Sequence, residues 1–102
     1  MPNGEEAGSS PTYRIFETRS FLADLANLGS VTQKRLQAKL RDYVYPILRQ
    51  TPHSGPNIKR LKNWDPPTWR YRVGDWRFFY EIDERHRIVF MTVADHRKEA
   101  YR

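Results

Sequence analysis

Cationic side chains are concentrated in the second half of this 102-residue chain, and their types limit the chemistry it could perform. Between Lys59 and Arg77 there are six Lys or Arg residues against two acidic ones, Asp65 and Asp75. Arginine presents a planar, permanently charged fork that matches the oxygens of a phosphate group. This density of cations suits metal-free cleavage of an RNA phosphodiester, in which positive donors stabilise the pentavalent phosphate.

Motifs for other chemistry are missing from the sequence. It contains no phosphate-cradling Gly-rich loop, no zinc-ligand spacing, no His-Glu helix pair and no nucleophile elbow. We therefore predict no metal and no cofactor. The polar residues that remain as candidates are Lys59, Arg60, Lys62, Arg70, Arg72, Arg77, His96, Arg97 and Lys98, together with Tyr101.

A β-hairpin within residues 68–82 must position the central arginines. Gly74 opens a two-residue connection, and glycine in that position suits a turn of type II′. Such a turn fixes the register so that Arg72 lies directly opposite Arg77. Two arginines in that position repel each other by roughly a few tenths of a kcal/mol. An anionic ligand would offset this repulsion, and so would a nearby carboxylate such as Glu81 or Asp95.

Alternation along the hairpin separates an apolar face from a basic face. The apolar face, which we expect in the core, carries Trp69, Tyr71, Val73, Trp76, Phe78 and Tyr80. The basic face carries Arg70, Arg72, Arg77 and Phe79. A following strand should add Val89, Met91 and Val93 to the core, and Ile88, Phe90 and Thr92 to the basic face. Rings beside cations suit a surface that grips bases and phosphates together. A plain solvated surface, or a patch covered by a partner chain, would give the same pattern.

Two helices are expected before the hairpin. Apolar residues at helical spacing predict one helix from Ser20, capped by Thr18 or Ser20 itself, and a second from Ser30 in which Pro46 introduces a kink. We therefore predict an α+β fold, in which an N-terminal helical hairpin packs on one face of an antiparallel sheet. Residues 12–102 would form a single domain.

The remaining segments are a tail, two short strands and a loop. Residues 1–11 are rich in Gly, Ser, Pro and Glu and are expected to be disordered. Residues 12–17 and 58–62 read as strands, the second with Arg60 and Lys62 on one side. His53 falls in the loop directly before the second of these strands, where we expect a surface histidine without a carboxylate partner.

Composition restricts the compartment and the partners. The chain has no cysteine, which excludes a disulfide framework or a thiolate metal site and favours a reducing compartment. No apolar run approaches the roughly 18 residues of a membrane span. We expect a cytoplasmic protein without a membrane partner. The net charge of +6 and the pI of about 9.9 predict binding to nucleic acid or to an acidic protein.

Two segments resemble the RelE/ParE family of bacterial toxins from type II toxin–antitoxin systems. They are the stretch from Trp69 to Asp83, with its R-x-R-V-G-D-W-R and Y-x-I-D patterns, and the H-R-K-x-x-Y pattern that ends at Tyr101. The resemblance implies one of two activities. RelE-like members cleave mRNA in the ribosomal A site, whereas ParE-like members poison DNA gyrase without cleaving RNA. A non-catalytic basic module that binds nucleic acid or an acidic partner is the third reading.

The resemblance also implies roles for individual residues. In the RelE-like pattern, basic residues at the positions of Arg70, Arg72 and Arg77 surround the scissile phosphate, and a C-terminal tyrosine that matches Tyr101 stacks or assists proton transfer. The best-known members have lysines at the first two positions, and one lysine is often assigned as the general base. Arginine, with a pKa above about 12, is a poor base. His96 or Tyr101 would have to contribute instead.

The predicted site therefore has two parts. The residues assigned to catalysis are Arg70, Arg72, Arg77, His96 and Tyr101. The residues assigned to nucleic-acid binding are Lys59, Arg60, Lys62, Phe79, Arg97 and Lys98. The resemblance further implies a cognate antitoxin, which we expect to be acidic and partly disordered, and through which alone operator DNA would be bound. The other partner would be the ribosome with its mRNA or, for the ParE-like activity, DNA gyrase.

Overall fold

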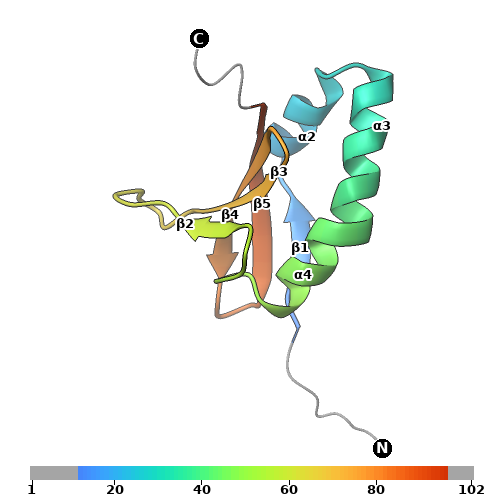
Figure 1. Cartoon of the computed structure of the whole chain (residues 1–102). Helices are drawn as coiled ribbons and strands as arrows, with labels where there is room; N and C mark the ends of the chain where they lie inside the picture. The colour runs from blue at the N-terminus through green and yellow to red at the C-terminus, as the bar shows by residue number, and fades with distance from the viewer. Residues whose placement is uncertain (1–11, 97–102) are drawn as a thin grey trace, which may run out of the picture.

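A computed structural model of the chain describes residues 12–96 and shows a five-stranded sheet with helices packed on one face (Figure 1). The predicted α+β class is confirmed. The predicted tail over residues 1–11 lies outside the described residues, as do the predicted site residues Arg97, Lys98 and Tyr101. None of the helices within residues 12–96 is long and apolar enough to cross a membrane.

The elements follow the chain as one strand, a helical region and four further strands. The first part comprises β1 (Arg14–Glu17), α2 (Arg19–Ala26), α3 (Ser30–Lys39), the π-helical segment η1 (Leu40–Val44) and α4 (Tyr45–Gln50). The second part comprises β2 (Ile58–Arg60), β3 (Trp69–Val73), β4 (Trp76–Asp83) and β5 (Ile88–His96).

The sheet is mixed, so the prediction of a wholly antiparallel sheet is wrong at one edge. The strand order is β1-β5-β4-β3-β2, and β1 runs parallel to β5 while all other neighbours are antiparallel. A parallel pair needs a long crossover connection. The chain between β1 and β5 supplies it, because β1 pairs with the last strand and not with its neighbour in sequence.

The helices begin and bend where the sequence predicts. The Thr18 hydroxyl accepts a hydrogen bond of 3.2 Å from the backbone N–H of Phe21 and caps α2. Helix α3 begins at Ser30, directly after Gly29, whose φ of 85° lies in the left-handed region. The π-helical segment η1 ends two residues before Pro46. Pro46 lacks the backbone N–H that a regular helical turn requires. The helical hairpin itself is not confirmed, because α2 contacts mainly β5.

The β3–β4 hairpin has the predicted register. Gly74 has a φ of 57° and Asp75 does not have a positive φ, as a type II′ turn requires. Val73 lies opposite Trp76, and Arg72 lies opposite Arg77.

A bulge shifts the register between β4 and β5. Phe79 pairs with Val93, but Tyr80 pairs with Met91, so Thr92 is the extra residue on β5. The Thr92 hydroxyl donates a hydrogen bond of 3.2 Å to the carbonyl of Phe79. The predicted place of Val93 in the core is therefore wrong: Val93 lies on the basic face, and Ala94 lies opposite Phe78 in the core.

The core lies between the helices and the apolar face of the sheet. Its buried side chains are Tyr13, Phe21, Leu25, Leu36, Leu40, Val44, Tyr45, Leu48, Tyr71, Phe78, Tyr80, Val89, Met91 and Ala94. The predicted core residues Trp69, Val73 and Trp76 are only partly buried at its margin. The Tyr80 hydroxyl donates a hydrogen bond of 2.7 Å to the carbonyl of Pro52, and burial raises the pKa of this phenol well above its usual value.

His53 contacts Glu84, so the expectation that it lacks a carboxylate partner is wrong. The Tyr13 hydroxyl donates a hydrogen bond of 2.7 Å to the same carboxylate and accepts one of 3.0 Å from Arg87. The hydrogen bond from Tyr13 and, to a smaller extent, the contact with His53 lower the pKa of the Glu84 carboxyl group. The sequence could not indicate this cluster, because its members lie far apart in the chain.

Replacing Phe78 tests this face assignment. Phe78 is fully buried, so Phe78→Ala should lower the free energy of unfolding by about 3–5 kcal/mol in a urea titration. The matched control is Phe16→Ala, because Phe16 is 54% exposed on β1 and its loss should cost less than about 1 kcal/mol. Equal losses in the two variants would contradict the assignment.

Candidate nucleic-acid interface

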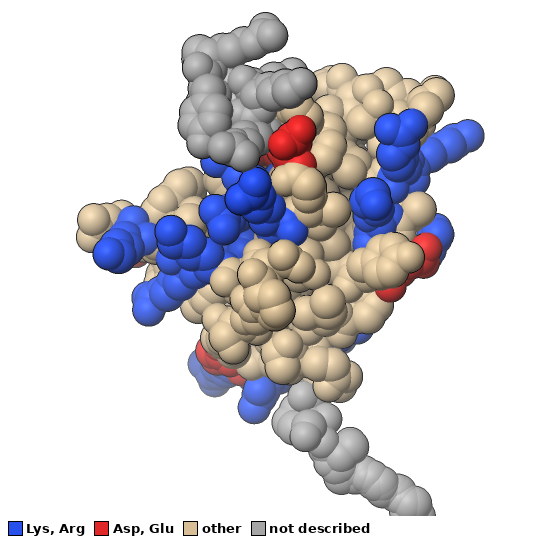
Figure 2. All heavy atoms as spheres, viewed as in Figure 1, with Lys and Arg blue, Asp and Glu red and all other residues tan. Residues whose placement is uncertain are grey.

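The sheet brings the predicted cations together in two adjacent rows on the basic face. In one row, Lys59 of β2 lies opposite Arg70 of β3, and Arg70 lies opposite Phe79 of β4. In the next row, Arg72 lies opposite Arg77. Figure 2 shows Lys and Arg side chains gathered over the β2 and β3 side of the molecule, with a second group over α3.

Asp95 is the acidic member of the second row. It lies opposite Arg77 across β4 and β5, and its Oδ2 accepts a hydrogen bond of 2.6 Å from Arg77 Nη2. The side chains are only 22% and 30% exposed, so this ion pair is partly buried. Of the two carboxylates that the sequence offered as arginine partners, Asp95 forms the ion pair with Arg77. The two rows together hold four cations and one carboxylate, a formal charge of +3.

Two guanidinium nitrogens of the basic face are buried without a hydrogen-bond acceptor. They are the Nε atoms of Arg70 and Arg77, which have no partner among residues 12–96. Arg72 is exposed, and its Nε donates a hydrogen bond of 3.2 Å to the carbonyl of Gly74. Leaving a buried donor unpaired costs about 1–3 kcal/mol. Such a cost calls for an explanation in a folded protein.

Three other predicted site residues lie away from these rows. Arg60 points to the opposite side of the sheet, where its guanidinium lies 5.5 Å from the ring centre of Trp69. Lys62 follows β2 in a turn. His96 lies opposite Trp76, with ring centres 4.7 Å apart, and both belong to the core side of the sheet. The described residues therefore place Asp95, and not His96, beside the arginines.

Trp64 belongs to this interface, although it was not among the predicted site residues. It lies between β2 and β3 and is 49% exposed. Its ring meets Phe79 edge to face with centres 5.6 Å apart, and the Arg77 guanidinium lies 5.8 Å from the centre of the Phe79 ring. The sequence signal that could have identified it is a Trp that closely follows a dense run of Lys and Arg.

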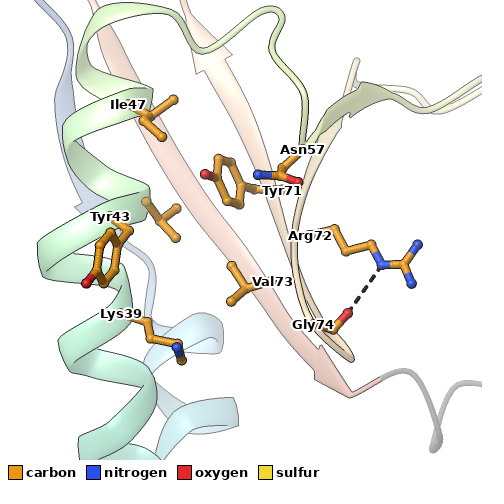
Figure 3. Close-up of a pocket in the computed structure, with 9 residues that line it drawn as sticks. Lys39, Tyr43, Ile47, Asn57, Tyr71, Arg72, Val73 and Gly74 are labelled. Atoms are coloured by element: carbon orange, nitrogen blue, oxygen red, sulfur yellow. Dashed lines mark hydrogen bonds between the residues drawn. The ribbon is translucent and has the colours of Figure 1, made fainter.

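A groove of about 460 Å³ separates the helical region from β3 (Figure 3). Lys39, Tyr43 and Ile47 line its helical wall. The opposite wall is formed by Asn57 and by residues 71–74 of the hairpin. Tyr43 and Ile47 are 67% and 41% exposed, so the helical wall of this groove presents apolar side chains to solvent. Among residues 12–96, no three His, Asp or Glu side chains gather as metal ligands would.

Known proteins share this sequence pattern and this fold. A family model described as the ParE toxin of the type II toxin–antitoxin system parDE matches residues 15–100. A search of curated protein sequences found no match. Among solved structures, the toxin–antitoxin complex RelBE2 from Mycobacterium tuberculosis is similar, with a TM-score of 0.66 and 26% identity over 84% of this chain and 99% of that chain.

Two further structures have the same fold at lower identity. The YoeB/ParE toxin from Agrobacterium tumefaciens has a TM-score of 0.62 and 22% identity, over 81% of this chain and 96% of that chain. A mutant of the E. coli toxin RelE in the free state has a TM-score of 0.61 and 17% identity, over 88% of each chain.

The Arg77–Asp95 pair predicts different stabilities for two neighbouring arginine variants. Arg77→Ala leaves a partly buried carboxylate unpaired and should cost about 1–3 kcal/mol of unfolding free energy. Arg72→Ala removes an exposed side chain and should change stability by less than about 0.5 kcal/mol. Urea titrations of both variants, and of the double variant Arg77→Ala, Asp95→Ala, measure the coupling. Equal losses in the two single variants would show that the ion pair contributes nothing.

Proposed function

The chain belongs to the ParE toxin family of type II toxin–antitoxin systems, and we propose that it is a metal-independent endoribonuclease that cleaves mRNA on the ribosome. The observation that carries the proposal is the pair of cationic rows on an open sheet face, next to exposed rings. Cations in that position can hold the phosphates of a single strand while the rings hold its bases.

In this proposal the arginines stabilise the reacting phosphate. The attacking 2′-hydroxyl turns the phosphate into a pentavalent species with additional negative charge, and fixed cations stabilise that species more than the ground state. Arg70 and Arg72 provide two forked donors on one strand, and Arg77 provides a third from the neighbouring strand. Asp95 keeps the guanidinium of Arg77 in place through its hydrogen bond.

The proton acceptor has to be a group other than an arginine. Asp95 is the carboxylate in contact with the arginines, and Tyr101, which lies outside the described residues, is the candidate implied by the resemblance. Asp95→Asn keeps the shape of the side chain but removes its capacity to accept a proton. A loss of cleavage on the order of a hundredfold or more with unchanged RNA affinity, together with loss of the acidic limb of the wild-type pH–rate profile, would assign the step to Asp95. Full activity would leave Tyr101 as the acceptor.

A ParE-like gyrase inhibitor is the second candidate. The family model that matches is the one for ParE toxins, and an inhibitor that binds gyrase needs no proton acceptor. This reading fits the arginines that replace the lysines of well-known RelE-like members. On either reading we propose an acidic antitoxin as partner, because the solved structures similar to this chain include a toxin–antitoxin complex. Lys39 and Arg72 at the rim of the apolar groove would face its carboxylates.

Two assays on the purified chain separate the candidates. In a cell-free translation reaction, primer extension on the translated mRNA should reveal new 5′ ends within codons, and untranslated mRNA should remain intact. Supercoiling by DNA gyrase should be unaffected at the same toxin concentration. Inhibited supercoiling with intact mRNA would overturn the endoribonuclease and establish the second candidate.

The basic face should be required for cleavage. Arg70→Ala and Arg72→Ala should each lower the cleavage rate on the order of a hundredfold, the loss typical of removing one charge-stabilising donor. Arg72→Lys should also be impaired, because a point ammonium cannot form the bidentate contact. The matched control is Arg35→Ala, which removes an exposed arginine of α3 and should keep full activity. Wild-type cleavage by the double variant Arg70→Ala, Arg72→Ala would remove this face from the mechanism.

A further inference from the structure

Trp64 is a large apolar side chain that the fold leaves half exposed in the connection between β2 and β3. The base of this connection is closed by a backbone hydrogen bond of 2.9 Å from Leu61 to Thr68, and the Thr68 hydroxyl donates one of 3.0 Å to the carbonyl of Pro66. These bonds position the loop through its backbone. The indole meets the Phe79 ring edge to face and leaves half of its surface exposed, so burial in the fold accounts for only part of this large side chain.

The surroundings of the indole match a nucleotide. By register, the row that holds Phe79 also holds Lys59 and Arg70, so the ring pair lies next to cations that can hold phosphates. A hollow of about 310 Å³ borders Trp64 and is lined by Arg60, Leu61, Lys62 and Asn63. Its volume is at the lower end of the range of small-molecule sites, about 300–1,000 Å³.

We propose that Trp64, supported by Phe79, stacks on one unpaired base of a single-stranded RNA whose phosphates lie along the basic face. The inference rests on the proposed function, because it takes RNA as the ligand. Stacking needs only the flat face of a base, so this contact fixes the position of the strand without reading its sequence. Trp64 is thus a positioning residue: it places the neighbouring phosphodiester on the arginines without touching the reacting atoms.

The test compares two probes of equal length and charge. One is a single-stranded RNA hexamer carrying 2′-O-methyl groups, which cannot be cleaved by attack of a 2′-hydroxyl. The other is an abasic phosphodiester hexamer. The affinity of the full chain for each is measured by fluorescence anisotropy at several salt concentrations. The wild-type chain should bind the RNA hexamer more tightly than the abasic one.

Trp64→Ala should weaken binding of the RNA hexamer by about 5- to 150-fold, the range for loss of one base–aromatic stack. Binding of the abasic hexamer should stay unchanged, and so should the salt dependence of RNA binding. Trp64→Phe keeps a ring and should stay within about threefold of wild type. Tyr43→Ala, which removes an exposed ring of the groove, should bind both probes like wild type.

Lys59→Ala provides the contrasting variant. It removes a phosphate contact, so it should weaken binding of both probes and reduce the salt slope by about 0.7. Equal weakening of both probes in Trp64→Ala would mean that the indole only holds the loop, and this would overturn the inference. If Trp64→Ala binds RNA as tightly as the wild type, the stacking inference is also overturned. This holds even if the variant no longer binds the antitoxin.

The outcomes separate this inference from the proposed function. If the Trp64→Ala variant binds RNA and cleaves translated mRNA like the wild type, the stacking role is overturned and the proposed endoribonuclease activity is retained. If Trp64→Ala weakens RNA binding but the wild-type protein leaves translated mRNA uncut, the endoribonuclease is overturned and the stacking site is retained.

Discussion

The structure depends on the burial of one face of the β3–β4 hairpin. Tyr71, Phe78 and Tyr80 are fully or almost fully buried against the helices. A slip of one residue would turn all of them toward solvent, at roughly 1.5–3 kcal/mol for each side chain. This cost holds the register, and the register in turn places the arginines of both strands on the opposite face. The strands that carry the basic face are therefore positioned by the core behind them.

Helix α2 supports the same arrangement at the end of β5. Strand β1 ends opposite Met91, so the last residues of β5 have no strand on that side. There the Asp24 carboxylate accepts a hydrogen bond of 3.0 Å from the backbone N–H of Ala94. The next residue is Asp95, which holds Arg77. A side chain of the helical layer thus stabilises the backbone that presents the carboxylate paired with Arg77.

Local sequence signals predicted the hairpin, the cap at Thr18 and the start of α3, because each depends on residues close together in the chain. The partner of β1 could not be predicted in this way, since it lies more than 70 residues away. The bulge at Thr92 had the largest effect on the site. One extra residue reverses the face of every side chain that follows it. It brings Asp95 to the basic face and His96 to the other side, and the sequence alone gives no sign of it.

The basic face carries several features that folding alone would disfavour. Arg72 and Arg77 lie opposite each other, two guanidinium Nε atoms are buried without an acceptor, and a tryptophan is half exposed. The partner Asp95 accounts for one arginine, and a solvated surface would account for scattered charges. Neither accounts for the tryptophan. A single-stranded nucleic acid would offset the arginine repulsion and cover the tryptophan together, because its phosphates supply negative charge while its bases stack on the ring. The same ligand would therefore stabilise the face that binds it.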